Sequence, residues 1–437
     1  MNGSGAPVRR ARATVTGIGL VSPVGGTVGA FFDALCAGRS GITRPPEGHP
    51  VAGIVPVAAI APDIDPASVL PATESRFVDR FAVMAVAAAD AALADAGIVV
   101  GRDVDPARTA VVVANSFGGL TLFEEQALNR HRAGHTAVSP YLLGGMLPNM
   151  ATAWITIRHR VRGFSGATSA ACASGGYAVA EALRLVRDGL ADVVVCGGTD
   201  APLLPTIATA FRNARALASG WDGEPAAASR TFDRRRSGLV LGEGAGVLVV
   251  ERSEHADARG RGGYADVIGW GVASDGHHVT MPRPDGTGAA ASMRLALADA
   301  GVTPAEVGYI NAHATGTKVG DVAEARAIRA VFDRHQPAVS SIKGTTGHLL
   351  AAAGAVEAAA TSLSVNSGLL PPTRNLDDPD PECELDHVRK AVRRVELDTA
   401  LTCSFAFGGQ NVSLLLARPG TRTRRAVTTH LESGGSG

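Results

Sequence analysis

Short apolar runs rich in β-branched residues recur along the chain, and long alanine- and leucine-rich patterns separate most of them. Runs of this length and composition predict buried strands, and the longer patterns predict helices. Strands that alternate with helices indicate an α/β fold in which a sheet is covered on both faces. The predicted strands lie in ATVTGIGLVSP, TAVVVANS, DVVVCGG, GAGVLVVE, ADVIGWGVAS, GYINAHA and LTCSFAFGG.

Two helical patterns are apolar nearly all round, and each opens on a turn of small residues. They are CASGGYAVAEALRLV, starting at residue 172, and GHLLAAAGAVEAAATSL, starting at residue 347. A helix without a polar face must be buried, so the pair predicts two central helices in a duplicated fold. The polar segment ERSEHADARGRGG, residues 251–263, divides the chain into a longer first part and a shorter second part.

Composition excludes several classes of protein. The 437 residues carry 41 basic and 41 acidic side chains, and this balance gives no reason to expect nucleic acid or a membrane surface as partner. The basic start, MNGSGAPVRRARA, lacks the apolar segment of a secretory signal, and the longest alanine-rich stretch is interrupted by Asp90 and Asp95. Five scattered cysteines without a CxxC pair indicate reduced thiols and a cytoplasmic protein.

One of these cysteines, Cys172, lies in TSAACASGG, where a strand is expected to give way to a helix. At the first turn of a helix, the helix dipole and free backbone N–H groups favour thiolate over thiol. A cysteine among small apolar residues is also commonly no more than core, so this position alone leaves both interpretations open. His313 in NAHATGT and His348 in KGTTGH could converge on Cys172, and Lys343 is one of only three lysines.

The motifs then identify a family. In the same order along the chain stand SAACASGG, SRTFDRRRSGLVLGEGAG, NAHATGT, KGTTGH, PPTRNL and FAFGGQN. The chain resembles a β-ketoacyl synthase of the condensing-enzyme family over about residues 14–419. The resemblance implies the thiolase fold, a duplicated five-layered α-β-α-β-α architecture. Its halves would span residues 12–255 and 256–419, followed by a tail or linker at 420–437.

The resemblance also implies roles for individual residues. Cys172, His313 and His348 would be catalytic, with Lys343 in support and the backbone N–H groups of Cys172 and Phe407 as the oxyanion hole. An acyl chain on Cys172 would then be extended by decarboxylative Claisen condensation with malonyl on a carrier protein. The resemblance further implies a polar network around Lys343 (Asp321, Glu324, Glu357) and contacts to the phosphopantetheine arm (Thr315, Thr317), with no separate cofactor and no metal.

Several residues depart from the usual pattern of fatty-acid members. Phe117 stands where a smaller aliphatic residue is common, and we expect its ring to narrow the acyl pocket. Asp200, in GGTDAPLLP, replaces the commoner Glu, and the TDAP segment resembles catalytic ketosynthase subunits of bacterial type II polyketide systems. In FAFGGQN, Ala406 stands before Phe407 where glycine is usual, and the glycines are Gly408 and Gly409, a turn that acts as a mobile gate in the family. These departures favour a polyketide or polyene pathway over housekeeping fatty-acid elongation.

The resemblance implies two kinds of partner. One is an acidic acyl carrier protein, and the other is a second subunit, which would make either a homodimer or a heterodimer with a chain-length-factor homologue. Four arginines are candidates for docking the carrier, although ordinary surface charge explains them equally well: Arg76, Arg80, Arg130 and Arg132.

Three other interpretations remain open from the sequence. A thiolase would use a second cysteine, and Cys403 is the residue in question. A non-catalytic partner subunit would lack Cys172, which this chain retains. A zinc site built from Cys172 and the two histidines lacks an evident fourth ligand.

Overall fold

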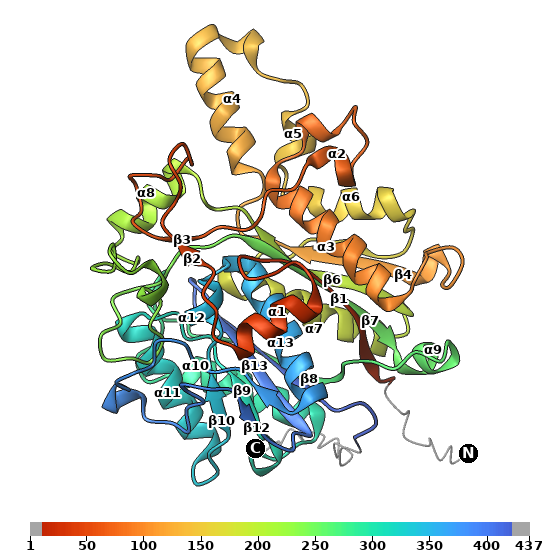
Figure 1. Cartoon of the computed structure of the whole chain (residues 1–437). Helices are drawn as coiled ribbons and strands as arrows, with labels where there is room; N and C mark the ends of the chain where they lie inside the picture. Colours follow the sequence, from red (N-terminus) through yellow and green to blue (C-terminus); the bar gives the residue numbers. More distant parts are fainter. Residues whose placement is uncertain (1–10, 422–437) are drawn as a thin grey trace, which may run out of the picture.

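A computed structural model describes residues 11–421, which form two halves of identical topology (Figure 1). In each half the strands occur in the spatial order third, second, fourth, fifth and first along the chain. In each half the first three strands in that order are parallel, and the last two are antiparallel to their neighbours. The repeated topology accounts for the duplication that the two apolar helical patterns predicted.

The ten strands form one continuous sheet because the two halves join at a corner. Ala13, Thr14 and Val15 of the first strand pair with residues 265–267, and the strands then diverge. In spatial order the N-terminal strands are β5 (Ser165–Gly166), β4 (Thr109–Ala114), β6 (Val193–Asp200), β7 (Gly244–Arg252) and β1 (Ala13–Val21). The C-terminal strands are β10 (Ala338–Ser340), β9 (Tyr309–Asn311), β13 (Thr399–Phe405), β14 (Gln410–Ala417) and β8 (Ala265–Ser274).

Helices complete the five expected layers. The central layer consists of α7 (Ser174–Arg187) and α13 (Ala353–Ser367), which contact each other and strands of both halves. The outer face of the N-terminal half is covered by α3 (Arg80–Ala96) and α6 (Met150–His159), and that of the C-terminal half by α10 (Thr287–Ala300) and α11 (Lys318–Phe332). The prediction of an α-β-α-β-α architecture with two buried central helices is confirmed.

The two central helices differ in how completely they are buried. Every residue of α13 from Ala353 to Val365 is buried, as its pattern predicted. On α7 the polar residues Glu181, Arg184 and Arg187 remain partly exposed, so this helix has a solvent-facing edge. Close approach explains two of the surrounding glycines, because a Cβ at Gly175 or Gly198 would lie 2.7 or 2.2 Å from the Ala351 carbonyl oxygen.

The seven apolar runs all contain strands. Three strands of the main sheet were not predicted: the two-residue β5, the three-residue β10 and the eight-residue β14. The polar dividing segment holds a short helix, α9 (Ser253–Ala258). Other helices connect the layers: α1 (Val28–Cys36), α2 (Pro66–Val69), α4 (Leu120–Ala133), α5 (Leu142–Met146), α8 (Pro205–Asn213) and α12 (Lys343–Thr346). Two small ribbons lie outside the main sheet: β2 (Ile42–Thr43) with β3 (Ala58–Ala59), and β11 (Leu369–Leu370) with β12 (Arg393–Arg394).

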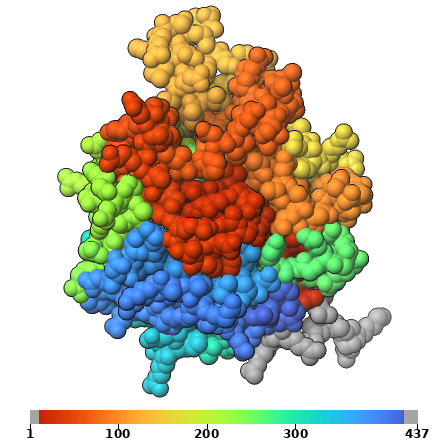
Figure 2. Space-filling view, in the orientation of Figure 1, coloured from red at the N-terminus to blue at the C-terminus, as the bar shows by residue number. Residues whose placement is uncertain are grey.

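One segment stands away from the body. Helix α4 projects at the top of the molecule, and none of its side chains is buried (Figures 1 and 2). Across residues 11–421 no helix is both long enough and apolar enough to span a membrane. Most of the expected tail, residues 422–437, lies outside the described part of the chain.

Candidate active site

Cys172 lies in a strained turn at the entrance to the central helix α7. The turn is a 3-10 helix, η4 (Ala171–Ala173). Ala171 adopts a φ of 45°, a backbone conformation that is unfavourable for any residue other than glycine. The Ser174 hydroxyl holds the turn in place, since it accepts the Ala170 N–H at 2.8 Å and donates to the Ala171 carbonyl at 2.6 Å. This strained backbone presents the Cys172 side chain at the floor of a cavity.

The electrostatic setting of Cys172 differs from the sequence expectation. The residue precedes α7 rather than lying in its first turn, and only 9% of its surface is exposed. Burial raises the pKa of the thiol to about 12, although the Lys343 cation acts in the opposite direction. Desolvation therefore favours the thiol over the thiolate, and attack by the sulfur calls for a nearby base.

Two histidines from the C-terminal half reach this thiol. The His348 Nε2 lies 3.1 Å from the Cys172 Sγ, within hydrogen-bonding distance. His313 follows β9, and its ring stands nearly perpendicular to that of His348, with ring centroids 5.4 Å apart. Burial holds the pKa of both imidazoles well below the usual range, and the Lys343 charge adds to this effect. Both rings are therefore neutral, so each can donate one N–H to an oxygen that gains negative charge.

Lys343 is buried directly behind His313. Its Nζ pairs with the Glu357 carboxylate, donates to the His313 carbonyl at 2.5 Å and lies 3.5 Å from the His313 Nδ1. Burial raises the pKa of Glu357 to about 7, whereas the Lys343 charge lowers it. This buried cation therefore holds the backbone of His313 and lies beside its ring nitrogen.

The other two acids of the expected network do not bond to Lys343. Glu324 accepts the backbone N–H groups of His313 at 2.8 Å and Ala314 at 2.7 Å. Asp321 accepts the N–H groups of Phe232, Thr315 and Gly316. Both carboxylates are buried, and they position the loop after β9 instead of bonding to the lysine.

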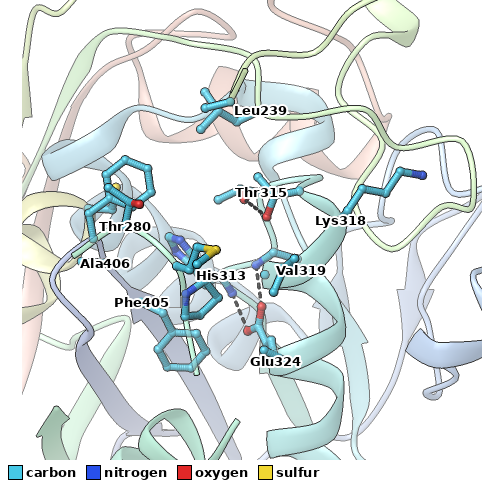
Figure 3. A pocket seen from close by; sticks show the side chains of 18 of the residues that line it. Leu239, Thr280, His313, Thr315, Lys318, Val319, Glu324, Phe405 and Ala406 are labelled. Atoms are coloured by element: carbon cyan, nitrogen blue, oxygen red, sulfur yellow. Dashed lines mark hydrogen bonds between the residues drawn. The ribbon is translucent and has the colours of Figure 1, made fainter. Parts of the chain in front are cut away.

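The cavity above these residues has a volume of about 370 Å³ (Figure 3). Thr315 and Thr317, expected to contact a phosphopantetheine arm, line it together, with their hydroxyl oxygens 3.3 Å apart. Figure 3 shows His313 and Phe405 deep in the cavity and Lys318 pointing outward at its rim. Its walls also include Phe211, Leu239, Met281, Val319, Ala406 and Phe407.

Phe407 lies on the turn between β13 and β14. Its side chain is 41% exposed and stacks on Phe211, with ring centroids 6.4 Å apart. Gly408 and Gly409 follow with φ of 84° and 71°, conformations that favour glycine, and neither glycine lines the cavity. Phe117 also lies outside the cavity walls, and it packs on the hydrophobic cluster that contains Cys172.

The predicted docking arginines have different environments. Arg76, Arg130 and Arg132 are exposed. The guanidinium of Arg80 instead binds Glu243 at 2.7 Å and Asp63 at 3.1 Å and donates to the Ala61 carbonyl. Arg80 is thus engaged in a structural ion pair and does not present a free charge to a carrier.

Three residues of this region were not predicted as site residues. Phe405 packs on His313 with ring centroids 5.9 Å apart, and Phe211 supports Phe407. Asp200 joins two loops beside Cys172 through backbone hydrogen bonds. The replacement of the usual Glu by Asp200 was a signal for this residue, and Phe405 is the first residue of the FAFGGQN motif, whereas Phe211 lies in none of the motifs.

The remaining alternatives also have structural outcomes. Cys403 is fully buried in β13, 3.6 Å from the Ser413 hydroxyl, and does not line the cavity. Among residues 11–421 no group of three His, Cys, Asp or Glu side chains is arranged to hold a metal ion. A buried thiol beside a neutral imidazole, under a cavity open to an acyl chain, is arranged for nucleophilic acyl transfer.

Comparisons with known proteins agree with this chemistry. A family model described as beta-ketoacyl synthase, N-terminal domain, matches residues 11–256, and its C-terminal counterpart matches residues 264–377. The 3-oxoacyl-(acyl-carrier-protein) synthase 2 of Synechocystis is 38% identical over 411 residues, covering 94% of this chain and 98% of that protein. The enzyme of the same name from Rhizobium meliloti is 39% identical, covering 93% and 99%.

Solved structures give the same fold. The ishigamide ketosynthase/chain length factor superposes with a TM-score of 0.86 at 33% identity, covering 94% of this chain and all of that chain. A type II polyketide synthase ketosynthase in complex with its acyl-carrier protein gives 0.85 at 28%, with the same coverage. The fold and the site define a condensing acyltransferase. The chain belongs to the β-ketoacyl synthase family, and the resemblance read from its motifs is confirmed.

Proposed function

We propose that this protein elongates acyl chains on an acyl carrier protein in a type II polyketide or polyene pathway, with Cys172 as nucleophile and His313 and His348 as its catalytic partners. The observation that carries the proposal is the 3.1 Å contact between the Cys172 Sγ and the His348 Nε2, with His313 beside it at the floor of one cavity.

The first half-reaction transfers the acyl group. The Cys172 sulfur attacks the thioester carbonyl of the acyl carrier, its proton leaves through His348, and the carrier departs as a thiol. The backbone N–H groups of Cys172 and Phe407 stabilise the oxyanion of the tetrahedral intermediate. Such donors typically contribute about 3 to 4 kcal/mol to lowering a barrier.

The second half-reaction forms the carbon–carbon bond. Malonyl carrier loses carbon dioxide, and the electron pair of the broken bond becomes an enolate whose oxygen accepts N–H groups from His313 and His348. The enolate carbon then attacks the acyl thioester on Cys172, and the thiolate leaves as a β-ketoacyl carrier is released. Burial, with the Lys343 charge adding to it, keeps the pKa of both imidazoles low and the rings neutral, which suits them as donors to the enolate oxygen.

The partners follow from the same reaction. Both substrates arrive on the phosphopantetheine arm of a carrier protein, which Thr315 and Thr317 contact, and no further cofactor takes part. A second subunit, either another copy or a chain-length-factor homologue, completes the enzyme, as the pairing in the ishigamide ketosynthase/chain length factor suggests. The exposed Arg76, Arg130 and Arg132 remain candidates for docking the carrier, and the protein acts in the cytoplasm.

Housekeeping fatty-acid elongation is the second candidate function. The curated relatives at 37–39% identity carry fatty-acid-type names, which favours it. Phe117 and the TDAP segment favour the polyketide setting, because both depart from the usual pattern of fatty-acid members, and Phe117 packs on the cluster that contains the nucleophile.

Intact-protein mass spectrometry after incubation with a panel of acyl-carrier thioesters tests the proposal. We expect a mass increase equal to the acyl group, and we expect Cys172→Ala to abolish it while the protein stays folded. Acylation that appears only when the neighbouring subunit is co-expressed supports the heterodimeric polyketide enzyme. Efficient acylation by long saturated chains supports fatty-acid elongation, and acylation that persists in Cys172→Ala overturns the assignment of the nucleophile.

A further inference from the structure

Asp200 is a buried carboxylate that the reaction described above does not use. It is the last residue of β6, and 1% of its surface is exposed. Its Oδ1 accepts the Ser116 N–H at 3.1 Å, and its Oδ2 accepts the Ala351 N–H at 2.9 Å. One side chain therefore joins two segments that lie 235 positions apart in the sequence, as the residue numbers 116 and 351 show.

Both joined segments border the nucleophile. Ser116 is followed by Phe117, which packs on the cluster containing Cys172, Leu203 and Leu350. Ala351 lies in the 3-10 turn η7 (Leu350–Ala352), which follows His348 and contacts the turn that carries Cys172. Leu350 has a φ of 49°, so the second segment is strained and needs bonds that keep it in place.

The length of this side chain fixes the separation of the two segments. Glutamate has one more methylene and would displace a partner by about 1.5 Å, the length of a carbon–carbon bond. An apolar pocket discriminates substrates that differ by one methylene by about 10- to 200-fold, and a shift of this size is comparable to the length that one methylene adds. Asp200 is thus suited to set how closely the Phe117 segment packs against the cluster that contains Cys172.

We infer that Asp200 is a positioning residue that determines acyl-chain selectivity by holding the Phe117 segment against the strained turn after His348. The inference rests on the proposed function for its readout, since selectivity is measured as acylation of Cys172. Asp200 touches neither acyl group nor reacting atoms, and it acts through Phe117.

The test measures the rate of acyl-enzyme formation with butyryl and dodecanoyl carrier and compares their ratio among variants. We expect Asp200→Glu to change this ratio by about tenfold. In a Phe117→Ala background, we expect Asp200→Glu to change the ratio by less than about twofold, because sites that act through one contact are not additive. An equal change in both backgrounds, or an unchanged ratio in a folded Asp200→Glu protein, overturns the inference.

Hydrogen exchange tests whether the two hydrogen bonds of Asp200 clamp the two segments together. It needs no substrate, so its outcome does not depend on the proposed function. Asp200→Asn loses one acceptor, because the amide NH₂ meets a backbone N–H. We expect faster exchange in segments 115–118 and 350–352 of the whole protein. Asp266→Asn, which replaces a buried carboxylate where the two halves join, is the matched control and should leave both segments unchanged. Unchanged exchange in Asp200→Asn excludes the clamp, even if the wild-type protein is never acylated.

Discussion

The two halves of the molecule contain the same backbone device and use it differently. In each half a 3-10 turn leads into a buried central helix, and its first residue adopts a positive φ without being glycine, 45° at Ala171 and 49° at Leu350. The residue after it is Cys172 in the N-terminal half and Ala351 in the C-terminal half. The strained turn therefore belongs to the duplicated scaffold, and the nucleophile is a side chain placed on only one copy.

The halves also exchange contacts across the centre. The end of β6, from the N-terminal half, reaches the C-terminal turn, where the Asp200 carboxylate accepts the Ala351 N–H at 2.9 Å. The end of β13, from the C-terminal half, reaches the N-terminal turn, and Phe407 follows it. Strand β6 thus supplies the carboxylate acceptor of Asp200, and strand β13 leads to the proposed backbone N–H donor of Phe407. The contact from the N-terminal half therefore holds the fold, and the contact from the C-terminal half is the one proposed to stabilise charge.

Removing the histidines should have the largest effect, because only the C-terminal half supplies them. We expect His348→Ala and His313→Ala each to lower condensation by about 10² to 10⁴-fold, the usual contribution of positioned proton donors. His348 is the residue in contact with the Cys172 Sγ, so its loss should slow acyl-enzyme formation more than the loss of His313. Acylation and malonyl decarboxylation, measured separately, check this.

His131→Ala is the control for the histidine variants, since His131 is exposed on α4. It should leave both half-reactions unchanged. Equal losses in acylation and decarboxylation for His313→Ala and His348→Ala would contradict the division of roles between the two rings.

Lys343→Met should have the next largest effect, because it leaves Glu357 buried without its cation. Breaking one side of a buried ion pair typically costs about 3 to 5 kcal/mol, although protonation of Glu357, whose pKa burial already raises to about 7, will reduce this. Adding Glu357→Gln should restore part of the free energy of unfolding but not the activity, since the contact to the His313 carbonyl is still missing.

Denaturant unfolding and condensation assays on the same preparations check the lysine variants. Lys390→Met, at an exposed position, is the matched control and should change neither quantity. Restoration of activity by Glu357→Gln in the Lys343→Met protein would show that Lys343 serves only to neutralise the acid.

The sequence was sufficient for the scaffold and the reacting groups but not for the residues that hold them. Periodicity identified α13 and most of the longer strands, because burial on all sides and short β-branched runs are local signals, but it missed the eight-residue β14. The sequence did not indicate that Glu324 and Asp321 bind backbone N–H groups of the loop after β9, because such contacts leave no pattern in the sequence. The pKa of Cys172 was also misjudged, since desolvation depends on how segments remote in sequence pack around the thiol.

The smallest effect concerns two carboxylates that each hold two backbone N–H groups, Asp200 in one half and Glu324 in the other. Burial raises the pKa of Asp200 to about 6 and that of Glu324 to about 8. Between its ordinary pKa of 4.5 and about 8, Glu324 keeps its proton in the folded protein and loses it in the unfolded chain. The free energy of unfolding must therefore fall as pH rises through this range, by at most about 1.4 kcal/mol per pH unit for one proton.

Glu324→Gln removes this titration, so the stability difference between the wild type and the variant should shift in favour of the variant as pH rises from about 6.5 to about 8. Asp200→Asn should show no such shift there, because Asp200 has already titrated. Above about pH 6.5 the buried neutral histidines contribute little to the slope. Urea unfolding of the three proteins at several pH values measures the difference, and curves for the wild type and Glu324→Gln that stay parallel would mean that Glu324 is ionised at neutral pH like an ordinary acid.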